Sequence, residues 1–293
     1  MSFKSGFVAI VGRANVGKST LLNHLMGQKI SIVTHKAQTT RMRIQAVLNR
    51  EDGQIVFVDT PGMHKPKNRL GEFMVEEIDE TMPEMDVILM MIDGSEGVGP
   101  GDEFMASRLP EQGVKILLIN KLDKMTPESF EAVSSEAKQL ADFSEVLGIS
   151  ALDGVTIAQL PDLIMDYLPE GPAYFPEEQW TNLDLRTITS EIIREKALMY
   201  LDQEIPHGIA VVIDTFEEEP EIVNIQATII VERDSHKGIV IGKGGRKLKG
   251  IGQEARKDIE QLLEKKVFLE LWVKVRENWR RSAHHVADFG YRK

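Results

Sequence analysis

The segment Gly12–Ser19 reads GRANVGKS, which fits the pattern G-x-x-x-x-G-K-[S/T] and constrains the fold more than any other feature. It follows an apolar run, Phe7–Val11, that predicts a buried strand, and it precedes a helical pattern over Thr20–Met26. In a loop that joins a strand to a helix in this way, the backbone N–H groups of the loop and of the helix amino end point at bound phosphates. The alternative is a tight turn without a ligand. The sequence and its context favour a nucleotide-binding α/β domain.

Two side chains of this segment carry specific chemistry. Lys18 is expected to reach the β and γ phosphates, and the hydroxyl of Ser19 is an oxygen ligand of the kind that Mg²⁺ prefers. The residues expected to surround the phosphates are Gly12, Asn15, Val16, Gly17, Lys18, Ser19 and Thr20.

Three further apolar runs, Ile55–Val58, Val87–Ile92 and Val114–Ile119, predict buried strands, and helical patterns separate most of them. Short strands that alternate with helices indicate a mostly parallel sheet covered by helices on both faces. Ligands of such a sheet bind at the carboxyl ends of the strands.

The tetrapeptide DTPG, Asp59–Gly62, stands at one of these strand ends. Asp59 is suited to hold Mg²⁺ through water, and the N–H of Gly62 is suited to contact a γ-phosphate. Pro61–Arg69 is therefore expected to change conformation when that phosphate leaves. Taken alone, the motif is also typical of a simple turn. The expected nucleotide contacts here are Asp59, Thr60, Pro61 and Gly62.

The motif NKLD, Asn120–Asp123, follows the next strand and predicts the base. The Asp123 carboxylate is able to accept hydrogen bonds from N1–H and the 2-amino group of guanine. Adenine lacks that donor pair and would leave the carboxylate unpaired, at a cost on the order of 1 to 3 kcal/mol or more. The motif therefore favours GTP and GDP over ATP. The expected base contacts are Asn120, Lys121, Asp123, Ser150, Ala151 and Leu152, the last three after the apolar run Val146–Ile149.

The segment Gln28–Arg43 is polar and lacks a clear period, as expected of a mobile loop. It contains Thr39 and Thr40, either of which is a candidate Mg²⁺ ligand, with Thr40 preferred. The metal ligands expected are Ser19, Thr40 and Asp59, and the catalytic residues expected are Lys18, Thr40 and Gly62.

Hydrolysis is expected to be slow because the residues after Gly62 include no glutamine that would orient water. Those residues are Met63 and His64. Met63 is unable to orient water, and an isolated loop histidine is usually only solvated.

The net charge of −11 is distributed unevenly along the chain. Residues 1–182 contain 16 basic and 27 acidic residues, whereas residues 183–293 contain 19 of each. Within the second part, Arg233–Lys257 contains eight basic residues against Asp234 and Glu254. An overall acidic chain would ordinarily argue against a nucleic-acid partner, but this segment is a candidate anion-binding face.

The chain contains no cysteine, which excludes disulfides and thiolate metal sites. No stretch approaches the roughly 18 apolar residues of a spanning helix, and Met1–Phe7 lacks the apolar core of a signal peptide. We expect a cytoplasmic protein.

The sequence LPEGPAYFP over Leu168–Pro176 predicts a linker because proline and glycine break helices. We expect a GTP-binding domain at residues 1–170, a linker at 171–182 and a second domain at 183–293. The elements expected in the second domain are a helix over Leu183–Leu201, strands over His207–Thr215 and Ile222–Val231, helices over Ser235–Ile241 and Lys247–Leu263, and a strand over Val267–Val275.

Between the two shorter helical patterns of this αββααβ order lies VIGKGGR, Val240–Arg246, which contains G-x-x-G. Such a turn lets a nucleic-acid backbone approach closely while apolar groove residues meet unpaired bases, as in the KH module, whose bacterial arrangement this order resembles. The alternative is a glycine-rich helix connection. The expected RNA contacts are Ile241, Gly242, Lys243, Gly244, Gly245 and Arg246, followed by Lys274, Arg276, Trp279 and Arg280. For Trp279, packing within its own domain is an equal alternative.

The four nucleotide motifs resemble those of the GTPase family within the phosphate-loop NTPases over residues 5–170. With the KH-like part, essentially the whole chain resembles the Era family of ribosome-assembly GTPases, through the segments KAQTTR, DTPGMHKPK, NKLD, SALDG and WVKVRENWR. Ala14 stands where that family commonly has proline. The resemblance implies Mg²⁺ dependence and, through Asn15, a K⁺ ion near the phosphates, as in some members of the subgroup.

The resemblance also implies partners: the 3′ region of 16S ribosomal RNA, the 30S subunit during its maturation, and the inner surface of the cell membrane as a peripheral contact. We expect a monomer in which GTP favours RNA binding and hydrolysis relaxes it. The alternative function is a GTP-regulated, membrane-associated scaffold that recruits protein partners, because basic residues also suit anionic lipid.

Overall fold

The computed structural model describes residues 2–34, 39–62, 66–201 and 205–291. These residues form two compact units, the first within residues 1–182 and the second including residues 183–293. Each unit has its own sheet.

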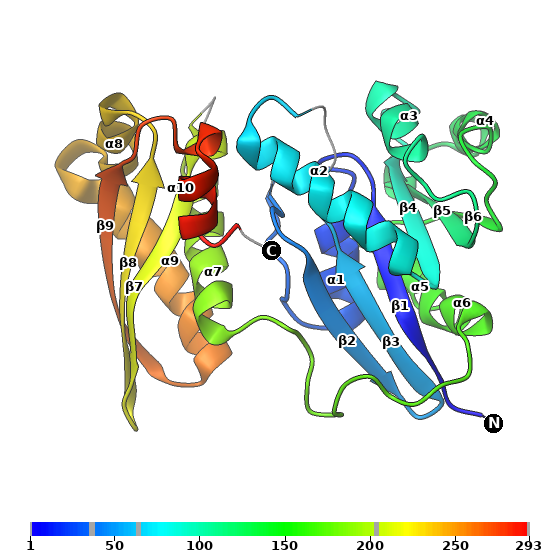
Figure 1. The fold of residues 1–293 in the computed structure, drawn as a ribbon, viewed down its shortest axis with the longest axis horizontal. Coiled ribbons are helices and arrows are strands. Elements are labelled where there is room, and N and C mark those ends of the chain that lie inside the picture. Colours follow the sequence, from blue (N-terminus) through cyan, green and yellow to red (C-terminus); the bar gives the residue numbers. More distant parts are fainter. Residues whose placement is uncertain (1, 35–38, 63–65, 202–204, 292–293) are drawn as a thin grey trace. The chain divides into compact units, whose positions relative to one another are not determined.

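The sheet of the first unit has the strand order β2-β3-β1-β4-β5-β6 (Figure 1). Its strands are β1 (Lys4–Val11), β2 (Ile44–Arg50), β3 (Gly53–Asp59), β4 (Val87–Asp93), β5 (Val114–Asn120) and β6 (Glu145–Gly148). All neighbouring pairs are parallel except β2 and β3, which are antiparallel. The predicted mostly parallel sheet is therefore confirmed, and β2 adds an antiparallel edge strand that the apolar runs did not reveal.

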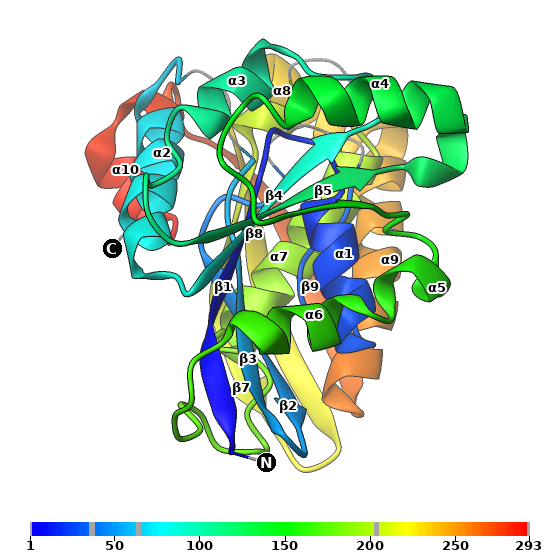
Figure 2. The ribbon, with the colours of Figure 1, turned by 90° about the vertical axis from the view of Figure 1, so that its right-hand side faces the viewer.

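Helices cover both faces of this sheet. They are α1 (Lys18–Met26), α2 (Arg69–Thr81), α3 (Pro100–Ala106), α4 (Pro127–Ala137), α5 (Gly154–Ile157) and α6 (Leu160–Tyr167). Side chains of α2, α3 and α4, such as Ile78, Met105 and Ala137, join one apolar core with residues of β1, β4 and β5. Helices α1 and α6 lie on the opposite face (Figure 2). The carboxyl ends of β1, β3, β4 and β5 thus open toward the same edge.

The residues expected to link the domains lie along the β2–β3 edge of the first unit. Val47 donates its backbone N–H to the carbonyl of Trp180 at 3.0 Å, and the Thr181 hydroxyl donates to the carbonyl of Gln45 at 2.8 Å. The Gln54 side chain accepts from the backbone N–H of Phe175 at 3.0 Å. This segment is therefore hydrogen-bonded to folded structure, while the predicted domain bounds stay a prediction.

The second unit follows the predicted αββααβ order, which is confirmed. Its elements are α7 (Leu185–Met199), β7 (Ala210–Glu218), β8 (Ile222–Val231), α8 (Asp234–Ile241), α9 (Arg246–Leu263), β9 (Lys266–Val275) and, after this order, α10 (Ala283–Asp288). The strand order is β7-β8-β9, with β8 antiparallel to β7 and parallel to β9.

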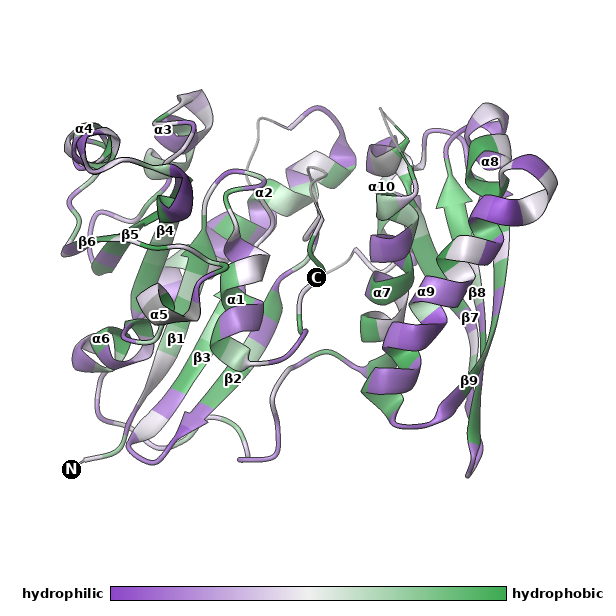
Figure 3. Ribbon diagram, turned by 180° about the vertical axis from the view of Figure 1, so that it is seen from behind, coloured by the Kyte–Doolittle hydropathy of each residue, from purple (hydrophilic) through white to green (hydrophobic). Residues whose placement is uncertain are grey.

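Helix α9 illustrates why the second unit folds as it does. Ile251, Ala255 and Ile259 recur every four residues on one face of the helix, and all three are fully buried. The remainder of α9 is largely hydrophilic (Figure 3). The apolar stripe fixes the helix, and with it the glycine-containing turn at its amino end.

Candidate functional site: a nucleotide site and a glycine loop

The phosphate loop adopts a conformation that requires small residues. Gly12 and Gly17 have φ values of +151° and +110°, and Asn15 has a φ of 65°. A Cβ atom on Gly17 would lie 2.3 Å from Nδ2 of Asn120, and one on Gly12 would lie 2.3 Å from the carbonyl oxygen of Met91. Both glycines are therefore required by the backbone conformation and by close contact.

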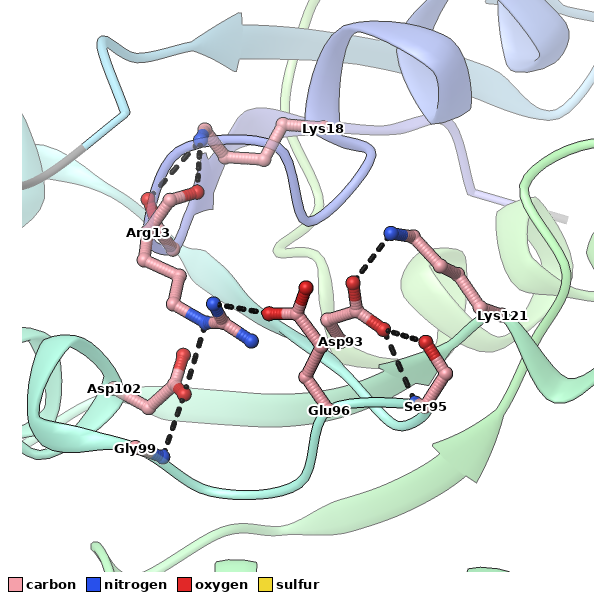
Figure 4. A network of polar contacts seen from close by, with 9 residues as sticks. Arg13, Lys18, Asp93, Ser95, Glu96, Gly99, Asp102 and Lys121 are labelled. Carbon is pink, nitrogen blue, oxygen red and sulfur yellow. Dashed lines mark hydrogen bonds and ion pairs between the residues drawn. The ribbon is translucent and has the colours of Figure 1, made fainter. Parts of the chain in front are cut away.

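Lys18 begins α1 and points back into the loop (Figure 4). Its Nζ donates hydrogen bonds to the carbonyl oxygens of Gly12 and Arg13, both at 3.0 Å. Only 6% of the residue is exposed. Burial lowers the pKa of Lys18 to about 8, although the charge of Asp59 opposes the shift. A buried ammonium group inside a loop of backbone amides is suited to attract an anion.

Asp59 gathers three hydroxyl groups around one carboxylate oxygen. Ser19 and Ser31 each donate to Oδ2 of Asp59 at 2.9 Å, and the Thr40 hydroxyl lies 3.3 Å from the same atom. Ser19 Oγ and Thr40 Oγ1 are 2.9 Å apart. Asp59 is fully buried, and burial raises its pKa despite the charge of Lys18 and the three hydroxyl contacts.

This cluster fits a magnesium ion by its chemistry. All donors are oxygens, and Oδ1 of Asp59 is buried without a hydrogen-bond partner within the described residues. A divalent cation would satisfy that oxygen and compensate the buried charge. Ile44 pairs with Asp59 across β2 and β3, which brings Thr40 to the site. Sequence reasoning missed Ser31, because its position in a loop without a period gives no signal.

The Asp59–Gly62 segment lies against the phosphate loop. Thr60 is fully buried, and its hydroxyl donates to the carbonyl of Ile10 at 2.9 Å. A Cβ atom on Gly62 would lie 2.8 Å from Cα of Ala14, so only glycine permits this approach. Pro61 between them is buried. Met63 and His64, the positions considered for water orientation, lie outside the described residues.

Asn120 joins the phosphate loop to the predicted base-binding loop. Its Nδ2 donates to the carbonyl of Val16 at 2.6 Å, and its Oδ1 accepts from the backbone N–H of Ala151 at 2.8 Å. Asn120 is 2% exposed. One side chain thus connects three segments that are far apart in the sequence.

Asp123 is exposed, and its Oδ1 accepts from the Ser150 hydroxyl at 2.8 Å. Lys121 pairs with Asp93 at the end of β4. Burial alone would raise the pKa of Asp93, but hydrogen bonds from Lys121 and Ser95 lower it below its ordinary value. Leu152 is 79% exposed. The structure thus brings Asn120, Asp123, Ser150 and Ala151 together.

The glycine loop of the second unit joins α8 to α9. Gly242, Gly244 and Gly245 have φ values of 72°, 62° and 76°, which glycine adopts without strain. Lys243 and Arg246 are exposed. Ile241, which ends α8, is half-buried.

Trp279 corrects an expectation. Its side chain is fully buried, and its Nε1–H donates to the carbonyl of Gly208 at 2.9 Å. Its ring centroid lies 5.3 Å from that of Phe289 and 6.0 Å from that of Tyr291. The expectation that Trp279 contacts RNA was wrong, and the alternative, packing within its own domain, is confirmed, because an aromatic ring at the centre of its own core presents no face to RNA.

The basic residues near Trp279 differ in how far their side chains are exposed to bind a phosphate. Arg280 is partly buried, and its guanidinium is paired with the carboxylate of Glu232. Lys274 and Arg276 are exposed. Lys274 and Arg276 are therefore better placed than Arg280 to meet a phosphate.

Comparisons with known proteins match each of the two units to a family. Residues 7–121 match the family described as 50S ribosome-binding GTPase, and residues 204–280 match the KH domain. The chain is 52% identical to the GTPase Era of Alkaliphilus oremlandii (strain OhILAs) over 296 residues, which cover 99% of this chain and all of that protein. It is also 52% identical to the GTPase Era of Alkaliphilus metalliredigens (strain QYMF) over 294 residues, with the same coverage.

Two solved structures share the whole fold. Era in complex with MgGDPNP and nucleotides 1506–1542 of 16S ribosomal RNA has a TM-score of 0.96, is 44% identical, and aligns over 99% of this chain and 100% of its own. A single-residue variant of Aquifex aeolicus Era bound to GDP and AlF4⁻ has a TM-score of 0.95 at the same identity and coverage.

The fold and the motif-bearing strand ends define a phosphate-loop GTPase followed by a KH domain. More particularly, the chain belongs to the Era family of GTPases. Within the described residues, no helix is long and apolar enough to cross a lipid bilayer.

Proposed function

We propose that this GTPase is a nucleotide-controlled RNA-binding protein that binds the 3′ region of 16S ribosomal RNA during maturation of the 30S subunit. The observation that carries the proposal is the Gly242–Arg246 loop, in which Lys243, Gly244 and Arg246 are exposed, in a chain that aligns over 99% of its length with an Era solved on nucleotides 1506–1542 of that RNA. Lys243 and Arg246 contact phosphates, and Ile241 meets a base.

In the nucleotide site, Lys18 binds the β and γ phosphates, and Ser19, Thr40 and Asp59 hold Mg²⁺. The ion neutralises phosphate charge when it is bound. Proximity of Thr40 to Ser19 and Asp59 supports Thr40 over Thr39 as the switch residue. Lys18, Thr40 and the N–H of Gly62 stabilise the negative charge that develops during hydrolysis.

The path from nucleotide to RNA runs through β2 and the linker. Thr40 precedes β2 by only a short segment, and Ile44 pairs with Asp59. On its other edge, β2 is hydrogen-bonded to the linker residues Trp180 and Thr181. A change at Thr40 on loss of the γ-phosphate therefore displaces β2 and the hydrogen-bonded linker, which leads to the KH domain.

The proposal is tested by RNA binding at several salt concentrations. The probes are an RNA of the 16S 3′ end, a scrambled RNA of equal composition, and anionic vesicles. Selective binding of the first RNA at moderate salt supports the proposal. Affinity for vesicles without RNA selectivity would instead support the alternative, a membrane-associated scaffold that recruits protein partners. The exposed cations fit both classes of anion, but the glycine loop favours RNA.

Two finer points belong to the same proposal. Hydrolysis is slow without a stimulating partner, because the segment after Gly62 has no glutamine. Asn15, whose φ of 65° sets its direction in the phosphate loop, helps to hold K⁺ beside the phosphates. Equal hydrolysis rates in K⁺ and Na⁺ would refute the role of K⁺ and leave the RNA assignment intact.

A further inference from the structure

Polar residues from outside the recognised motifs surround the side chain of Arg13, the second residue of the phosphate loop (Figure 4). Arg13 Nη1 donates to Oε2 of Glu96 at 2.7 Å, and its Nε lies 3.1 Å from Oδ2 of Asp102. The same Asp102 oxygen accepts from the backbone N–H of Gly99 at 3.0 Å. These acidic residues belong to the connection between β4 and α3 and to α3 itself.

Asp102 is an unusual residue for a surface helix because its side chain is fully buried. Burial raises its pKa, and Arg13 opposes that shift. Its Oδ1 has no hydrogen-bond partner within the described residues. A buried carboxylate is costly unless a cation compensates it, so the Arg13 side chain is held at this place by a strong electrostatic preference.

The ion pairs of Arg13 with Asp102 and Glu96 also restrain the phosphate loop, because Arg13 is part of that loop. Its backbone carbonyl accepts a hydrogen bond from Lys18 Nζ at 3.0 Å, so its side chain and its backbone face different parts of the site. Asp93, the last residue of β4, pairs with Lys121 of the NKLD motif. The end of β4 and its connection to α3 therefore contact both the base-recognition segment, through Asp93, and the phosphate loop, through Glu96.

We infer that Asp102 is a positioning residue for nucleotide binding and acts through Arg13. It fixes the side chain of Arg13 and so fixes the loop carbonyls that orient the Lys18 ammonium. Glu96, whose side chain is 63% exposed, supports the same guanidinium from the solvent side. The inference rests on the nucleotide site proposed above.

The test is a double-mutant cycle on GDP affinity. Asp102→Asn keeps the size of the side chain and removes its charge, and Arg13→Gln removes the cation. Each single change is expected to weaken GDP binding about 5- to 30-fold, which corresponds to the coupling typical of contacting charged groups. The GDP affinity of the double variant is expected to equal that of the single variant that binds GDP more weakly. It is not expected to fall by the product of the two single losses. Arg13→Lys is expected to retain part of the affinity.

The matched control is Glu103→Gln, an exposed neighbour on the same helix with the same change of charge, for which GDP affinity is expected to stay within twofold of the parent. Glu96→Gln removes the other ion pair of Arg13 at an exposed position, so it does not disturb the core. It is expected to weaken GDP binding less than Asp102→Asn does. In the Arg13→Gln background it is expected to have no effect on GDP affinity.

Thermal unfolding of each variant separates a loss of fold from a loss of positioning. Additive losses for Asp102 and Arg13, or GDP binding by the Asp102→Asn variant within twofold of the parent, would overturn the inference. Absence of GDP binding by the parent chain would overturn the nucleotide site itself, and the positioning role with it.

Discussion

Replacement of Asn120 by alanine is the most severe test of how the loops of the nucleotide site are held together. The change removes two buried hydrogen bonds and leaves the carbonyl of Val16 and the N–H of Ala151 without their partner. Each unsatisfied backbone group costs about 1 to 3 kcal/mol, so the total is about 2 to 6 kcal/mol. Both groups belong to loops that we assign to the nucleotide. Part of this free-energy cost is therefore expected as a lower free energy of unfolding, and part as weaker GDP binding.

The assay is titration calorimetry with GDP together with chemical denaturation. We expect GDP affinity to fall at least about 10-fold, equivalent to about 1.4 kcal/mol. The control is Asn49→Ala, since Asn49 also makes two side-chain hydrogen bonds, to Gln54 and Glu177, but at the partly exposed sheet edge. If Asn120→Ala bound GDP within twofold of the parent and lost less than about 0.5 kcal/mol of stability, the bridging role would be refuted.

The described contacts lead to three other predictions. Lys243→Ala and Arg246→Ala are each expected to weaken RNA binding and to flatten its salt dependence by about one unit per phosphate contact, measured by titration at several salt concentrations, whereas Lys266→Ala, at an exposed lysine outside Arg233–Lys257, is the neutral control. Trp279→Ala is expected to destabilise the second domain by about 3 to 5 kcal/mol in denaturant unfolding, and an unchanged midpoint would contradict its place in the core. Removal of Mg²⁺ by a chelator is expected to weaken GDP binding in the parent, and Ser19→Ala is expected to reduce that dependence; equal affinities with and without Mg²⁺ in the parent would disprove the metal assignment.

The nucleotide motifs could be predicted from sequence because each follows a buried apolar run. Parallel strands bring their carboxyl ends to one edge, so Ser19, Asp59 and Asn120 could be placed at one site before any contact was known. The order of elements in the KH domain could also be predicted, because apolar residues recur in its strands and helices with the periods typical of each.

The contacts between these segments could not be predicted. Asn120 bonds a carbonyl 104 residues away, and neither residue carries a local signal for the other. Strand β2, with the sequence IQAVLNR, has too weak an apolar pattern to be recognised, and it is stabilised by pairing with β3. Trp279 lies among basic residues in the sequence, but its partner Gly208 is distant, so tertiary packing decided its role.

Control of RNA binding by the nucleotide is the central claim, and one comparison tests it directly. The affinity for the 16S 3′-end RNA is measured on protein loaded with a nonhydrolysable GTP analogue and on protein loaded with GDP, at one fixed salt concentration. A coupling of about 1 to 3 kcal/mol, or roughly 5- to 150-fold tighter binding with the GTP analogue, is predicted. Equal affinities in the two states would contradict the account, because a nucleotide that does not change RNA affinity does not control it.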